Sequence, residues 1–233
     1  MSNGLYVSMA GAAARSEQLD AISDNLANVQ TPGFRSTKVA FQSFLASPGV
    51  TDKVFPAAVS SGLDMKPGQQ VVTDSPMDVV PDGMTFMAVG QPNGAVAYTR
   101  NGALQVINNT LVSGGMPVMD VTGKAIMIPP DGEPRMDPDG SVFVGSQVVG
   151  RVATFELSGN IQRLGATLYA PGPGGAATPA AEPALAVGEL EMGYPLEASI
   201  GMITAQRSYD MSIKALETYR SLDTRAVEIG RVR

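Results

Sequence analysis

The stretch Asn25–Phe34, which reads NLANVQTPGF, marks a point near the start of the chain where a helix must end. Pro32 lacks a backbone N–H and pushes the preceding Thr31 into an extended conformation, so a helix cannot continue through it. Asn28 suits the last turn of that helix, and Gly33 permits a sharp turn directly afterwards. The stretch therefore predicts a helix that stops near residue 28 and a chain that turns away from it.

The residues before this turn have helical periodicity. Apolar side chains recur seven residues apart, with two more placed three residues further on: Leu5, Ala12, Leu19 and Leu26, then Ile22 and Val29. This spacing is typical of an amphipathic helix with a coiled-coil-like seam. The small residues of segment 10–14 (AGAAA) would let a neighbouring helix approach closely, but they bury little area in an isolated helix.

A second helix is predicted at the other end of the chain. Pro195 suits its first turn, and the helical pattern continues to Val227 or Ile229. Its apolar residues form two stripes, Leu196, Ile200 and Ile203, then Tyr209, Ile213 and Leu216. The two terminal helices can pair only if the intervening domain brings both chain ends to one side.

Between the helices the pattern is that of short strands. Segments rich in β-branched and aromatic residues are 71–73, 84–89, 95–99, 104–106, 142–144 and 152–157. Residues 34–70 are irregular, and 171–183 are rich in Pro, Gly and Ala, which predicts a linker or exposed loop.

We therefore predict an α+β fold in which paired, coiled-coil-like terminal helices enclose a mainly β central domain, built as a small barrel or sandwich. Its expected parts are a helical domain (1–30 with 196–233), an extended connecting arm (31–70 with 184–195) and a β-rich domain (71–183).

Composition excludes several functions. The net charge of −6 and the lack of a basic run argue against nucleic-acid binding and against an anionic membrane surface. The chain has no Cys and no His, which excludes disulfides, thiolate zinc sites and His-based catalysis. We expect no catalytic residues, metal or cofactor. The N-terminus does not resemble a Sec signal peptide, and we expect no transmembrane segment.

Three local patterns suggest ligand chemistry only weakly. Asp137–Ser141 (DPDGS) resembles the start of a calcium loop but lacks the later ligands, so a hairpin turn is expected. Gly172–Gly175 (GPGG) has no following helix to hold a phosphate. Glu189 and Glu191 form a carboxylate pair, which would need a cleft to act on a bond.

Several stretches, in order, resemble the rod and hook axial proteins of the bacterial flagellum. They are Leu5–Ala12, Asn25–Asn28, Thr31–Phe34, Phe86–Val89, Ala97–Gly102, Pro117–Met119 and Met202–Tyr209. The opening segment is closer to a proximal-rod member than to the distal-rod member. The chain departs from the family at Glu191–Pro195 (EMGYP), where Ser-Asn-Val-Asn is usual, and it lacks the long insertion of a hook protein.

This resemblance implies a structural subunit and not an enzyme. It implies terminal helices that line the inner tube of an axial structure, and a β domain that forms the outer layer. It further implies export through the flagellar type III apparatus, assembly across the periplasm with copies of itself and other rod proteins, and transmission of torque from motor to hook. Contact with the bushing rings stays open.

The residues expected to carry this role fall into three groups. Helix packing is assigned to Leu5, Leu19, Ile22, Leu26, Ile200, Ile203 and Ile213. The turn from helix to arm is assigned to Asn25, Asn28, Thr31, Pro32, Gly33 and Phe34, and contacts with neighbouring subunits to Gln206, Arg207 and Tyr209. The alternatives are the distal-rod protein, a soluble β domain that binds a ligand and dimerises through its terminal helices, and a hydrolase that uses carboxylates.

Overall fold

The computed structural model describes residues 2–45, 54–130, 132–181 and 184–231, and it divides into two compact units. Unit 1 comprises Met1–Ala27, Thr37–Gly62 and Pro195–Arg233, and unit 2 comprises Asn28–Ser36 and Leu63–Tyr194. The described chain is helical at both ends and mostly β between them, as predicted.

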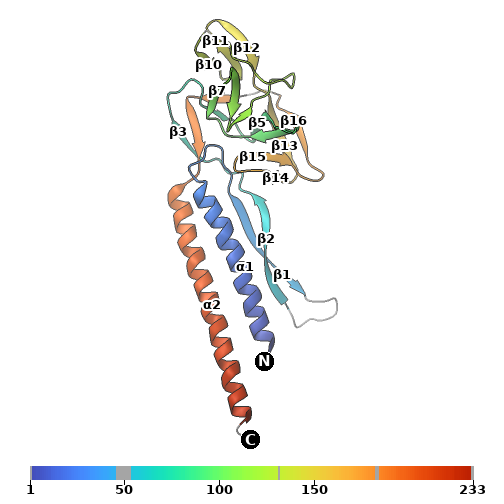
Figure 1. Ribbon diagram of the computed structural model, residues 1–233, viewed down its shortest axis with the longest axis vertical. Coiled ribbons are helices and arrows are strands. Elements are labelled where there is room, and N and C mark those ends of the chain that lie inside the picture. Colours follow the sequence, from blue (N-terminus) through green and yellow to red (C-terminus); the bar gives the residue numbers. More distant parts are fainter. Residues whose placement is uncertain (1, 46–53, 131, 182–183, 232–233) are drawn as a thin grey trace. The chain divides into compact units, whose positions relative to one another are not determined.

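Unit 1 contains two long helices and a pair of strands. Helix α1 (Ser2–Ala27) and helix α2 (Pro195–Arg231) lie side by side and run in opposite directions (Figure 1). Strand β1 (Thr37–Leu45) pairs with β2 (Val54–Leu63) and also contacts α1. The hydroxyl of Ser23 on α1 lies 3.6 Å from the sulfur of Met202 on α2. Within the described residues, neither helix has the length and apolarity needed to cross a membrane.

The largest sheet of unit 2 has six antiparallel strands in the order β14-β15-β6-β5-β13-β16. These strands are β5 (Thr85–Gly90), β6 (Val96–Thr99), β13 (Thr154–Ser158), β14 (Ile161–Arg163), β15 (Leu168–Pro171) and β16 (Ala176–Pro179). The four central residues of β5, Phe86–Val89, are all buried, which is typical of a strand covered on both faces.

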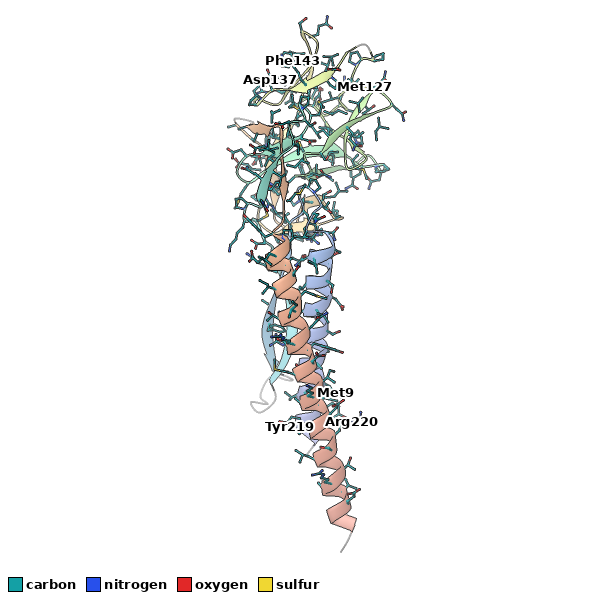
Figure 2. The ribbon with its side chains drawn as sticks, turned by 90° about the vertical axis from the view of Figure 1, so that its left-hand side faces the viewer. Met9, Met127, Asp137, Phe143, Tyr219 and Arg220 are labelled. Atoms are coloured by element: carbon teal, nitrogen blue, oxygen red, sulfur yellow. The ribbon has the colours of Figure 1, made fainter. Side chains whose placement is uncertain are left out.

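The other described strands of unit 2 form smaller antiparallel sheets. One contains β7 (Leu104–Ile107), β8 (Thr110–Ser113) and β9 (Met116–Pro117), and a second contains β10 (Pro134–Met136), β11 (Ser141–Val144) and β12 (Gln147–Arg151). Two strand pairs are β4 (Val79–Pro81) with β17 (Leu185–Val187), and β3 (Gln69–Val72) with β18 (Glu189–Met192). Figure 2 labels Asp137 and Phe143, which mark the β10–β11 region.

One apolar core joins these small sheets. Its fully buried members come from several strands and from isolated bridges between them, and include Val79, Met87, Leu111, Val118, Val142 and Val152. Burial of side chains this size contributes about 1.5–3 kcal/mol each. The core therefore holds together sheets that are too small to be stable alone.

The six strands expected from β-branched and aromatic content are confirmed, at β3, β5, β6, β7, β11 and β13. The single barrel or sandwich is replaced, among the described strands, by several small sheets. The expectation of a linker over 171–183 is wrong for β16, which pairs with β13 from Phe155↔Pro179 to Ser158↔Ala176. Backbone pairing needs no β-branched side chain, and Pro is tolerated at the edge of a sheet.

Candidate functional site

The residues assigned to helix packing differ in exposure along the two helices. Leu19, Ile22 and Leu26 on α1 and Ile213 on α2 are half-buried, whereas Ile200 and Ile203 are 57% and 51% exposed. The side chain of Leu5 lies outside the described residues. Helices α1 and α2 of unit 1 approach each other at small residues, because Ala12, Ala14 and Ala205 are buried. Burial of Ile200 and Ile203 in an assembly stays a prediction.

The three side chains assigned to neighbour contacts lie on α2. Gln206 and Arg207 are exposed, and Tyr209 is half-buried. Ala205, one residue before Gln206, is buried, so this part of α2 has a covered side and an open side. Contact with another subunit stays a prediction for all three.

Asn25 fastens the last turn of α1 to the first residue of β1. Its side-chain amide donates to the carbonyl of Thr37 (3.0 Å), and its side-chain oxygen accepts the N–H of Thr37 (2.8 Å). Both bonds lie within unit 1 and tie the two ends of segment 28–36 to each other. Asn suits this role because its side chain carries a donor and an acceptor together.

Beyond α1 the chain makes the predicted sharp turn. The N–H of Thr31 donates to the carbonyl of Asn28 (2.9 Å), and that of Phe34 to the carbonyl of Thr31 (3.2 Å). Gly33 has a φ of 71°, and a Cβ there would lie 2.1 Å from the carbonyl carbon of Arg100. Glycine is thus needed both for the backbone conformation and for the close approach. Pro32 is half-buried and Phe34 is buried.

Immediately after this turn lies a buried ion cluster formed by Arg35, Arg100 and Glu191, all within unit 2. Their side chains are 4%, 3% and 4% exposed. Nη2 of Arg35 donates to both carboxylate oxygens of Glu191 at 2.9 Å, and Arg100 donates to Oε2 from Nη2 (3.1 Å) and Nε (3.2 Å). One carboxylate therefore serves two guanidinium groups.

Backbone groups bind much of the remaining hydrogen-bonding capacity of these three side chains. Arg100 donates to the carbonyls of Pro81 (2.6 Å), Gly83 (3.0 Å) and Thr85 (2.5 Å). Arg35 donates to the carbonyl of Lys66 (2.7 Å), and Glu191 accepts the N–H of Gly68 (2.6 Å). The carbonyl dipoles help to offset the excess positive charge of two arginines facing one carboxylate.

Tyr169 and Arg163 extend the cluster toward the turn. The Tyr169 hydroxyl accepts the N–H of Arg35 (2.9 Å) and donates to the carbonyl of Gly33 (3.2 Å). Arg163 donates to the carbonyl of Arg35, and its guanidinium lies 4.6 Å from the ring centre of Phe34. The Tyr169 ring meets Phe86 edge-on, with 5.5 Å between ring centres. The turn after α1 is therefore anchored to the six-stranded sheet.

Burial and charge act in opposite directions on Glu191. Burial acts to raise the pKa of its carboxyl, but the charge of Arg100, the N–H of Gly68 and the charge of Arg35 outweigh it, so the pKa lies below its ordinary value. Burial lowers the pKa of Arg100 and raises the pKa of the Tyr169 hydroxyl. These partners thus favour the ionised form of the Glu191 carboxyl.

The cluster joins every segment of unit 2 that connects covalently to unit 1. The chain passes between units at residues 27–28, 36–37, 62–63 and 194–195. Arg35 precedes the second crossing, Lys66 and Gly68 follow the third, and Glu191 precedes the fourth. Main-chain bonds add to this connection: Gly33 N–H to Glu191 O, Gly193 N–H to Val29 O and Asp64 N–H to Ser36 O, each at 2.8 Å.

Pairing of the two terminal helices requires that the intervening domain bring the end of α1 and the start of α2 together, and unit 2 does so. Val29 lies two residues after α1 and Gly193 two residues before α2, and the two are hydrogen-bonded inside unit 2. A Cβ on Gly193 would come within 2.7 Å of the Val29 side chain, so the close approach requires glycine.

The sequence patterns do not predict this cluster. Glu191 stands in them as half of a carboxylate pair and as the start of the departure from the family, and no pattern assigns a role to Arg35 or Arg100. A usable signal was present, because Glu191 stands in the strand sequence Leu190-Glu191-Met192, where a charge on a buried strand requires a partner.

Two of the three weak ligand patterns are turns. Asp137–Ser141 closes the β10–β11 connection, with the N–H of Asp137 donating to the carbonyl of Ser141 (2.9 Å). Gly172–Gly175 is a turn between β15 and β16, closed by a Gly175 N–H to Gly172 O bond of 2.9 Å. Among the described residues, no group of three or more His, Cys, Asp or Glu side chains is placed to hold a metal ion.

Comparison with known proteins agrees with this architecture. Residues 5–35 match the model of the family described as flagella basal body rod protein. The flagellar basal-body rod protein FlgF of Mesorhizobium japonicum is 32% identical, over 71% of this chain and 70% of that protein. The chain belongs to the flagellar basal-body rod protein family.

Other members match almost the whole chain. FlgF of Salmonella typhimurium is 29% identical over 98% of both proteins. The rod protein FlgG of Caulobacter vibrioides is 27% identical over 92% of this chain and 94% of that protein. The chain is accordingly a structural rod protein similar to FlgF, and not an enzyme.

Proposed function

We propose that this protein is a FlgF-like subunit of the proximal rod, which assembles with copies of itself and with other rod subunits into the drive shaft of the flagellum. The similarity to several FlgF proteins supports this assignment, and the somewhat lower identity to FlgG makes the distal rod the second candidate. We further infer that the subunit is exported by the flagellar type III apparatus and works in the periplasm.

The observation that carries the proposal is the open apolar face of α2. Leu196, Ile200 and Ile203 are 76%, 57% and 51% exposed, although α2 packs on α1 along another side. A row of exposed large apolar residues is uncommon on a protein that works as a monomer and is typical of a contact surface. Pairing of the terminal helices in a coiled-coil-like manner inside an inner tube would cover this face.

Torque transmission requires that force on the helical unit reach the β unit. The covalent connections between the units leave unit 2 through segments held by the Arg35–Glu191–Arg100 cluster and its neighbours. Buried, charge-assisted bonds resist local opening better than exposed loops do. We infer that this cluster is the part of the subunit that keeps the connecting segments fixed under load.

Deletion of the gene, followed by electron microscopy of basal bodies, tests the proposed function. A rod that stops short and carries no hook is expected, and its length would distinguish the proximal from the distal rod. Complete rods with hooks would exclude a rod role and favour the soluble binding domain.

A point variant tests the role of the helices. Leu26→Asp would place an unpaired charge in the half-buried face of α1, where we expect it to block rod growth while unit 2 stays folded. Val148→Asp is the matched control, because Val148 is 60% exposed on β12 of unit 2. Motility on soft agar and thermal unfolding of both purified variants are the readouts. Normal motility of the Leu26 variant would contradict the assignment of this face.

A further inference from the structure

Unit 2 contains the dipeptide Asn-Gly twice among the described residues, at Asn93–Gly94 and at Asn101–Gly102. Asparagine is chemically labile, because the backbone nitrogen of the next residue can attack its side-chain carbonyl carbon. Glycine in the next position favours this attack, since it has no Cβ to shield the nitrogen. A third pair, Asn3–Gly4, lies in α1, and its side chains lie outside the described residues.

Asn93–Gly94 lies at the tip of the β5–β6 hairpin. The two strands pair as far as Gly90↔Val96, and beyond this pair the N–H of Gly94 donates to the carbonyl of Gln91 (2.9 Å). Asn93 and Gly94 are both exposed, and a Cβ on Gly94 would meet nothing within 4 Å. Water therefore reaches this turn, and few contacts resist its opening.

The Asn93 side chain folds back over the turn. Its oxygen Oδ1 accepts the N–H of Ala95 (3.0 Å). The ring closed by this hydrogen bond contains both the carbonyl carbon Cγ of Asn93 and the backbone nitrogen of Gly94, so the two reacting atoms are held in one short loop. The same N–H would stabilise the negative charge that develops on Oδ1 when Cγ is attacked.

Asn101–Gly102 repeats this hydrogen bond in a buried setting. Oδ1 of Asn101 accepts the N–H of Ala103 (3.1 Å), but Asn101 is only 8% exposed. The backbone of Gly102 is packed on Val79: its carbonyl accepts the Val79 N–H (3.0 Å), and a Cβ on Gly102 would overlap the Val79 carbonyl oxygen. Attack here requires that buried backbone move and that water enter, so the site must first open.

We propose that Asn93 is a site of spontaneous deamidation in the folded protein and that Asn101 is protected. Hydroxide removes the proton of the Gly94 N–H, and the nitrogen forms a bond to Cγ of Asn93. The side-chain nitrogen takes a proton from water and leaves as ammonia, which closes a five-membered succinimide ring. Water then opens the ring at either carbonyl and gives aspartate or isoaspartate, so the net reaction consumes one water and releases one ammonia.

The hydrogen bond from Gly94 to Gln91 opposes the first step, because it holds the proton that must leave. It lies at an exposed hairpin tip, so brief opening of this one turn releases the proton while β5 and β6 stay paired. Each completed reaction adds one negative charge to a chain whose net charge is −6 at pH 7. Ion-exchange chromatography therefore separates the product from the parent chain.

Incubation of the purified full chain in water that carries heavy oxygen measures both sites in the folded state. Opening of the succinimide ring places one heavy oxygen in the new acid. Digestion then follows in ordinary water, so conversion during digestion carries no label and is not counted. Trypsin cleavage after Arg100 places Asn93 and Asn101 on different peptides for mass spectrometry.

Labelled product should form at Asn93 more than about tenfold faster than at Asn101 in the folded chain, because the buried site reacts only after opening. In concentrated denaturant the two rates should agree within about threefold, because glycine follows both asparagines. A folded-state ratio no larger than the denatured-state ratio, or a folded chain without labelled product at Asn93, would overturn the proposal.

The variant Asn93→Gln tests whether the acidic form arises at this turn. Glutamine keeps the amide but would have to close a six-membered ring, so the acidic form should fall at least about fivefold. Asn160→Gln is the matched control, because Asn160 is also exposed but precedes the β-branched Ile161. An acidic form that persists in Asn93→Gln, or that falls equally in the control, would contradict the proposal. Both measurements use the free subunit, so their failure would leave the proposed rod function standing.

Discussion

Replacing Glu191 by Gln should destabilise unit 2 far more than an ordinary surface change. The substitution preserves the shape of the side chain and one oxygen acceptor for the N–H of Gly68. It removes the negative charge shared by Arg35 and Arg100, whose side chains are only 4% and 3% exposed. Two guanidinium groups would then lie close together without an anion.

The expected loss follows from this geometry. Removing one partner of a buried ion pair costs about 3–5 kcal/mol, because the remaining charge is left uncompensated. A domain is stable by roughly 5–15 kcal/mol, so the variant should fold but lose a large fraction of its stability. For a unit of roughly 140 residues, this corresponds to a drop in the thermal midpoint of about 10–15 °C.

Glu189→Gln is the matched control, because it makes the same chemical change two residues earlier on β18, outside the cluster of Arg35, Arg100 and Glu191. Chemical and thermal unfolding of the full chain, followed by circular dichroism at neutral pH, measure both variants. The free energy of unfolding of the control variant should fall by less than about 1 kcal/mol. Equal losses in the two variants, or a loss below about 1 kcal/mol for Glu191→Gln, would refute the view that the cluster holds unit 2 together.

Three further results are expected. The pKa of Glu191 is lower in the folded state than in the unfolded state, so its ionised carboxylate stabilises the fold above its unfolded-state pKa, and this stabilisation is lost as the pH falls through the folded-state pKa. The difference in unfolding free energy between wild type and Glu191→Gln should therefore become smaller in acid, which unfolding measured as a function of pH would show. Tyr169→Phe should cost about 1–3 kcal/mol in denaturant unfolding, because a buried N–H and a carbonyl lose their shared partner. Gly33→Ala should lower the thermal midpoint well beyond Gly83→Ala: both have positive φ, but a Cβ meets nothing within 4 Å at Gly83 and a carbonyl carbon at 2.1 Å at Gly33.

The elements that the sequence predicts well are those determined locally. The end of α1 follows from Pro32 and Gly33, and the strands β5 and β6 follow from their β-branched and aromatic residues. The strand β16 was missed because its side chains, AATP, carry no strand signal. It exists because the backbone of β13 offers an unpaired edge, which no local pattern reveals.

The ion cluster could not be predicted, because it depends on tertiary contacts. Its three members lie far apart in the sequence: Arg35 is 156 positions and Arg100 is 91 positions from Glu191. The family resemblance included the segments around Phe34 and Arg100, but it did not indicate that these segments meet. At Glu191 the sequence departs from the family pattern, which directed attention to the missing asparagines instead of the carboxylate.

The same topology explains why the cluster lies where it does. A subunit whose first and last residues both belong to one unit must pass its chain out to the other unit and back, and here it does so twice, at residues 27–28, 36–37, 62–63 and 194–195. Each crossing is a flexible point unless its flanking backbone is held. Arg35 and Glu191 hold three of the flanking segments with side-chain bonds, and the Val29–Gly193 main-chain bond secures the ends nearest the helices. Loss of one carboxylate should therefore loosen several connections together, so stiffness of the rod and stability of unit 2 should fall in the same variants.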